Sequence, residues 1–139
     1  MTVPQDYVLA GERFDALLSD LMAELDLTTR HQVYAVLHGV LTVFRRRLDA
    51  GEVLVFASGL PAMLRAMFVA GWTPDGEKQP FATLADYDRE ARDVRRHHNL
   101  MPEGSLPTVV RAVRRHCDPA AFDLALSKLP PEARAFWDA

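Results

Sequence analysis

The chain has 139 residues, of which 49% are hydrophobic and 25% are charged, and its formal net charge is −3 at pH 7. This composition excludes an intrinsically disordered chain, and the length suits one compact domain. The single cysteine, Cys117, excludes an internal disulfide and a zinc site built from several cysteines. The acidic balance makes nucleic acid an unlikely partner, because phosphate backbones are usually bound by basic domains or faces.

The most apolar window, residues 53–72, does not predict a membrane helix. Arg65 places a charge within it, and Gly59 and Pro61 divide it into two short helices, whereas a spanning helix needs about 20 mostly apolar residues in a row. Residues 1–6 lack the basic start and the apolar stretch of a secretory signal. We therefore expect no membrane association and a cytoplasmic location.

Apolar residues recur at helical spacing along the chain, and no segment alternates as a strand does. The first helix is predicted from a single apolar stripe, which consists of Phe14, Leu17, Leu18, Leu21, Met22 and Leu25. Thr29 and Gln32 have the spacing of a capping box, in which each side chain bonds an otherwise unpaired backbone N–H. A second helix begins there and carries Val33, Val36, Leu37, Val40, Leu41, Phe44 and Leu48.

Two shorter helices are predicted next. Asp49 and Glu52 again have capping-box spacing and open the third helix. We expect Gly59 to end it, because glycine accepts the left-handed conformation at a helix end. Pro61 suits the first turn of a fourth helix, where its missing N–H is not needed, and this helix should end near Gly71.

Residues 72–82 form a connector that is rich in turn-forming residues. After it, caps at Thr83, Ser105 and Asp118 predict the fifth, sixth and seventh helices. The pair Leu129 and Pro130 opens the eighth. The predicted fold is therefore an all-α bundle of about eight helices.

The second half of the chain nearly repeats the first half at an offset of 69 residues. The identical pairs are Arg45 and Arg114, Arg46 and Arg115, Asp49 and Asp118, Ser58 and Ser127, Leu60 and Leu129, Pro61 and Pro130, and Arg65 and Arg134. Such a pattern predicts two tandem four-helix repeats, about residues 11–72 and 83–138, within a single domain over residues 1–139. Their shorter helices are not stable alone, so we expect one interdigitated core with Leu60 and Leu129 buried at equivalent places.

The same order of features is given twice, in residues 33–72 and 106–137: a helix, a basic turn, an acidic cap, a short helix, a Leu-Pro pair, and then an arginine and an aromatic residue. In this pattern the chain resembles the bacterial family known as domain of unknown function 2267, over nearly its whole length from about Gly11. The resemblance implies an all-α bundle of two repeats. It implies no activity and supplies no catalytic residues.

Two basic clusters suggest contact with phosphate or another anion. Their members are Arg45, Arg46 and Arg47 in the first half and Arg111, Arg114, Arg115 and His116 in the second. The alternative is structural, because both clusters end a helix, where surface cations complement the helix dipole by about 0.3–1 kcal/mol each. A third basic group closes the fifth helix in the same way and consists of Arg95, Arg96, His97 and His98. We favour the structural interpretation.

No catalytic or metal-binding constellation stands out. His31 and His38 lie two helical turns apart, whereas helical metal pairs use a spacing of three or four residues. Cys117 aligns with Leu48, a core position, and we expect it to be a small buried hydrophobic residue. The remaining polar features are expected to be structural: Ser58 and Ser127 as caps of the helices that follow them, and Asp20, Glu24 and Asp26 as a solvated acidic face.

The two halves differ at positions that matter for an interface. Leu54 aligns with Asp123, and Met63 aligns with Glu132. If the acidic residues face water, the two apolar residues lie on an equivalent outward face, and exposed apolar patches usually mark interfaces. Val69, Trp72 and Phe81 lie close by in sequence. The alternative is that this face packs against the connector or the other repeat.

We expect a non-enzymatic module that binds a protein partner or forms a homodimer, without a cofactor, metal or catalytic residue. One alternative is a small-molecule binder with a pocket between the repeats, lined by residues such as Tyr34, Phe44, Phe68 and Trp72. Another is a weak nucleic-acid or phosphate binder that uses Arg45, Arg46, Arg114 and Arg115. An enzyme stays open, because active sites assembled in space leave no linear mark.

Overall fold

The computed structural model describes residues 2–94 and 101–139, and within these residues it contains helices and loops but no strand. The helices are α1 (Gln5–Val8), α2 (Ala10–Glu24), α3 (Arg30–Arg45), α4 (Ala50–Ser58), α5 (Ala62–Val69), α6 (Leu84–Asp93), α7 (Leu106–Arg115), α8 (Pro119–Ser127) and α9 (Pro131–Trp137). The all-α prediction is confirmed, with the short helix α1 in addition to the eight expected. In this described part of the chain, no helix has the length and apolar character needed to cross a bilayer.

Local capping fixes where the first helices begin. At the start of α3, the Gln32 N–H donates to Thr29 Oγ1 at 3.2 Å, and the Thr29 N–H donates to Gln32 Oε1 at 3.1 Å. Asp49 and Glu52 exchange the equivalent bonds at the start of α4, at 2.8 and 2.9 Å. Thr83 caps α6 in the same way. These three predicted caps are confirmed, because each depends only on residues three positions apart.

Two other predicted caps are wrong. The Ser105 hydroxyl donates backwards to the Pro102 carbonyl at 2.6 Å, and the first N–H of α7, that of Leu106, instead faces the Asp88 carboxylate of α6 at 3.4 Å. Asp118 makes no capping bond to α8. A carboxylate brought by the tertiary fold thus takes the place of a local cap at α7.

Ser58 and Ser127 also fail to cap the helices that follow them. Each hydroxyl donates to the carbonyl three residues earlier, Val55 for Ser58 and Leu124 for Ser127, and both bonds are 2.6 Å long. The two serines therefore close the last turns of α4 and α8.

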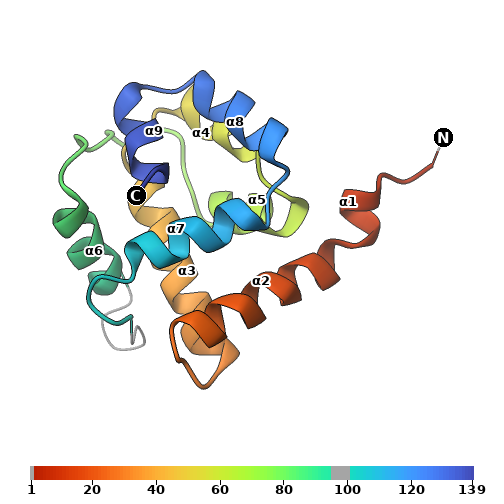
Figure 1. Cartoon of the computed structure of the whole chain (residues 1–139). Helices are drawn as coiled ribbons and strands as arrows, with labels where there is room; N and C mark the ends of the chain where they lie inside the picture. The colour runs from red at the N-terminus through yellow and green to blue at the C-terminus, as the bar shows by residue number, and fades with distance from the viewer. Residues whose placement is uncertain (1, 95–100) are drawn as a thin grey trace.

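Helix α3 runs through the middle of the bundle (Figure 1). Its buried residues follow one another almost without a break from Val33 to Phe44. It packs against α2, α5, α6 and α7. A helix enclosed in this way must be apolar around most of its circumference, as this sequence is.

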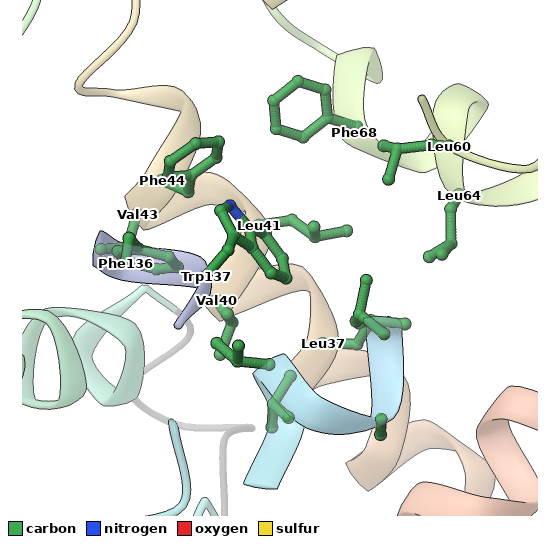
Figure 2. Close-up of a cluster of buried hydrophobic side chains, with 14 of the residues drawn as sticks. Leu37, Val40, Leu41, Val43, Phe44, Leu60, Leu64, Phe68, Phe136 and Trp137 are labelled. Atoms are coloured by element: carbon green, nitrogen blue, oxygen red, sulfur yellow. The ribbon is translucent and has the colours of Figure 1, made fainter. Parts of the chain in front are cut away.

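Six aromatic rings meet at the centre of the molecule, and they are Phe44, Phe56, Phe68, Phe122, Phe136 and Trp137. The ring centroid of Trp137 lies 5.4 Å from that of Phe44 and 5.3 Å from that of Phe56. Figure 2 shows Phe136 and Trp137 of α9 beside Phe44 of α3. Phe44 and Phe68, named above as candidate pocket residues, are core residues, with at most 1% of either exposed.

The first helix of each half lies on the second helix of the other half. Helix α6 packs along α3, and α2 packs along α7. The buried apolar side chains of both halves belong to one cluster. Leu60 and Leu129 are both buried, with 2% and 4% of their surface exposed, as expected.

Gly59 ends α4 for a different reason from the one expected. Its φ is −89°, which is not left-handed. A Cβ at this position would lie 2.8 Å from the Cβ of Ala125 and 3.1 Å from the carbonyl oxygen of Ala121. Glycine is therefore required because α8 passes directly against this end of α4. Gly71, after α5, does have a left-handed φ of +70°.

We predict that Gly59→Ala lowers the free energy of unfolding by about 1–3 kcal/mol, because the added methyl group overpacks the contact between α4 and α8. Gly11→Ala is the matched control, since a Cβ in that exposed turn of α2 meets nothing within 4 Å. It should stabilise the protein by about 0.4–1 kcal/mol. Urea unfolding measures both, and a neutral Gly59→Ala would show that the two helices do not approach this closely.

Candidate functional site

Arg45 and Arg114 each anchor the carboxyl end of another helix. Arg45 Nη1 donates to the Phe68 carbonyl at 2.8 Å and to the Ala70 carbonyl at 3.4 Å, at the end of α5. Arg114 Nη1 donates to the Trp137 carbonyl at 3.0 Å, at the end of α9. Carbonyls at a helix end lack intrahelical partners and carry partial negative charge, so a guanidinium stabilises both helices there.

The two arginines differ in how their charge is balanced. Arg114 forms ion pairs with Asp123 at 3.2 Å and with Asp138 at 3.8 Å. Arg45 forms no ion pair with any described residue, and its printed hydrogen bonds go only to carbonyls. Burial, together with the neighbouring charge of Arg46, lowers the pKa of Arg45.

Arg47 was grouped with surface cations, and this interpretation is wrong. Its side chain is only 4% exposed, and its Nη2 donates to Glu90 of α6 at 2.6 Å. Arg46 reaches the same carboxylate at 3.0 Å. Burial raises the pKa of Glu90, but hydrogen bonds from Arg47 and then Arg46 outweigh it and hold that pKa below its usual value. Glu90 was missed because it lies 43 residues from Arg47, and no local pattern connects them.

The second basic cluster binds the acidic residues of α2. Arg115 contacts Asp20 at 3.0 Å and Glu24 at 2.7 Å, and His116 Nε2 lies 2.9 Å from Asp20 Oδ2. The hydrogen bond with His116, followed by the Arg115 guanidinium, holds the pKa of Asp20 below its usual value despite some burial. Asp20 and Glu24 are therefore ion-pair partners between helices, and the expectation of a merely solvated face is wrong for them.

A hollow of about 460 Å³ lies next to this cluster, between the start of α2 and the ends of α4 and α7. Arg13, Arg65 and Arg115 line it together with Asp6. Asp6 accepts from the Ala62 N–H at 3.2 Å and lies 3.8 Å from Arg13 and 3.7 Å from Arg65. Each arginine here faces a carboxylate, so the hollow holds a balanced network. An acidic residue in the first turn of a helix was the sequence clue to Asp6 that the analysis left unused.

The positions at which the two halves differ face outward. Leu54 is 61% exposed and Met63 is 41% exposed, and their acidic counterparts Asp123 and Glu132 are also exposed. Val69 and Trp72 are half-buried, and both pack against the core. We refer to Leu54, Met63, Val69 and Trp72 as the α4–α5 apolar surface.

A second hollow, of about 200 Å³, lies between the end of α3 and the connector. Trp72 forms part of its wall, together with Arg45, Arg46 and Lys78. Arg46 is paired with Glu90, and Lys78 lies 3.6 Å from Glu52. The connector is held here by a bond of 2.7 Å from the Gln79 N–H to the Arg46 carbonyl.

The histidines do not assemble into a site within the described residues. His31 is exposed, and the ring of His38 stacks on Tyr34 with centroids 6.1 Å apart. His97 and His98, with Arg95 and Arg96, lie outside the described residues. Elsewhere in the chain, no group of three or more metal-binding side chains occurs.

Cys117 is buried, as expected. Burial raises the pKa of its thiol to about 12, with a smaller contribution from Asp118, while Arg114 acts in the opposite direction. A thiolate is the reactive form of cysteine. The side chain therefore packs as a small apolar residue beside the end of α7.

We predict that Cys117 resists thiol reagents in the folded protein. A pKa of about 12 leaves about one thiol in ten thousand ionised at pH 8. Modification should therefore be about a thousandfold slower than in the urea-unfolded chain, as measured with a chromogenic disulfide reagent. Equal rates in the folded and unfolded chains would contradict the buried position.

A comparison with known families supplies one match. A family model described as "Uncharacterized conserved protein (DUF2267)" matches residues 14–136. A search of curated proteins finds no match. The matched segment covers all helices from α3 to α8 and most of α2 and α9. The chain therefore belongs to the DUF2267 family of uncharacterised conserved proteins.

Proposed function

We propose that this protein is a non-enzymatic helical interaction module that binds a protein partner through the α4–α5 apolar surface. The observation that carries the proposal is the exposure of Leu54 and Met63, at 61% and 41%. A protein surface gains nothing in water from large apolar side chains at such positions, and apolar patches of this kind commonly mark contact sites.

The proposal includes an internal repeat, in which the second half shows what the same scaffold looks like without a docking surface. Two corresponding contacts recur 69 residues apart and support it. Arg45 and Arg114 each donate to the end of a short helix. Arg65 and Arg134 donate to the Leu60 and Leu129 carbonyls at 2.8 and 3.2 Å.

The outward faces of the two halves differ while the scaffold contacts recur. The second half carries Asp123 and Glu132, which interact well with water, where the first half carries Leu54 and Met63. We infer that the first face is covered by a partner when the protein acts. A second copy of the chain would meet the same requirement as another protein. The cytoplasmic location and bacterial origin expected from the sequence stay predictions.

Photo-crosslinking tests the proposal directly. A photoreactive amino acid in place of Leu54 should crosslink to one defined protein in the host cell, because this position lies inside the docking surface. The matched control is the same amino acid in place of Leu124, which is 60% exposed on α8. Adding Met63→Glu should remove the crosslink from position 54 while the melting temperature changes little.

The outcomes separate clearly. A defined product from position 54 that depends on Met63 and is absent from position 124 supports the docking surface, whether the product contains a second copy or another protein. The same products from both positions, or none from position 54 in folded protein, would contradict the proposal.

A further inference from the structure

Two arginines hold the same structural position in the two halves, but only one is neutralised. Arg114 bonds the end of α9 and also pairs with Asp123 and Asp138. Arg45 bonds the end of α5 and has no carboxylate partner among the described residues. The positions 69 residues before Asp123 and Asp138 are Leu54 and Val69. Both carboxylates that balance Arg114 are thus replaced by apolar residues in the first half.

The missing partner does not come from elsewhere in the chain. The residues outside the description, Met1 and residues 95–100, contain no aspartate or glutamate. Within the described part, Glu77 shares the 200 Å³ hollow with Arg45 but forms no ion pair with it, and Glu52 and Glu90 are taken by Lys78 and by Arg46 and Arg47.

Arg45 is therefore a partly buried cation with unused bonding capacity. A guanidinium stays charged in proteins and presents five N–H donors in a planar fork. Arg45 uses one nitrogen, Nη1, for the helix-end carbonyls. Arg114 shows that a guanidinium in this setting accepts carboxylates in addition to the helix end, since its Nη2 bonds Asp123 at 3.2 Å.

We infer that Arg45 and the hollow beside Trp72 receive the carboxylate of an acidic side chain from a protein segment that docks on the α4–α5 apolar surface. This inference rests on the proposed function and names the chemistry of its partner: an aspartate or glutamate flanked by apolar residues. The carboxylate restores beside Arg45 the charge balance that Asp123 and Asp138 supply beside Arg114. The apolar neighbours of the acid cover Leu54 and Val69.

A protein carboxylate fits better than a nucleic acid. A polyanion needs several unpaired cations, but Arg46 and Lys78 are already paired with Glu90 and Glu52. The net charge of −3 also repels a polyanion. A hollow of about 200 Å³ has room for one carboxyl group, since a water molecule takes about 30 Å³.

The test uses two short peptides with blocked ends, Leu-Asp-Leu and Leu-Asn-Leu, added to the full-length ¹⁵N-labelled protein. Nuclear magnetic resonance follows the Nε–H signals of Arg45 and Arg114 at low ionic strength, where screening is weak. We expect the aspartate peptide to shift the Arg45 signal saturably and to bind about tenfold or more tightly than the asparagine peptide, because hydrogen bonds to charged groups are the strong ones. The Arg114 signal should not move.

Three variants sharpen the test. Arg45→Gln should abolish the preference for aspartate, whereas Arg114→Gln, which loses the matching bond to a helix end, should keep it. Leu54→Asp should also abolish the preference, because it supplies a carboxylate beside Arg45 as Asp123 does beside Arg114. Leu54→Asp keeps the inference testable if Arg45→Gln fails to fold.

Each outcome decides the inference. Equal binding of the two peptides, with shifts at the Leu54 and Met63 amides, would overturn the carboxylate site and leave the docking surface standing. Inorganic phosphate that moves the Arg45 signal as far as the aspartate peptide would show a general anion site and overturn it too. An Arg45 signal unmoved by any probe also overturns it, and the crosslinking experiment then judges the docking surface separately.

Discussion

The structure depends on the contact of six aromatic rings at its centre. Trp137 of α9 lies 5.4 Å from Phe44 of α3 and 5.4 Å from Phe122 of α8, measured between ring centroids. Such pairs add about 0.5–1.5 kcal/mol each beyond the burial of their surface. Helices as short as α4, α5, α8 and α9 do not form alone in water, so each depends on rings supplied by the others. The rigidity of the outer faces follows from this shared centre.

On this common scaffold the two halves differ in their outward chemistry. Arg45 and Arg114 hold the ends of α5 and α9 in the same way. Around Arg114 the carboxylates complete a neutral, hydrated surface, whereas around Arg45 the scaffold ends in apolar side chains and an unbalanced charge. Because the two sets of contacts to the helix ends match, the difference is not needed for folding. It is most simply explained as the part of the molecule that meets a partner.

The sequence predicts features that depend on near neighbours. The capping boxes at Thr29 and Asp49 require residues only three positions apart, and the apolar stripes require only the helical period. Features that depend on distant segments could not be read in this way. Gly59 is needed because α8 passes against it, and Arg47 is buried because Glu90 arrives from α6. The exposure of Leu54 was foreseen only as a condition, since one sequence cannot show which face meets water.

The central claim is that both halves share one cooperative core, and unfolding in urea tests it most directly. In a Trp72→Phe background, Trp137 is the only tryptophan, so its fluorescence reports the aromatic centre while far-ultraviolet circular dichroism reports all helices. The account predicts coincident transitions with both probes. It also predicts that Leu60→Ala and Leu129→Ala each lower the free energy of unfolding by about 2–5 kcal/mol on both probes. A Leu60→Ala variant that shifts the circular dichroism transition but leaves the Trp137 transition in place would show that the halves unfold independently and would contradict the account.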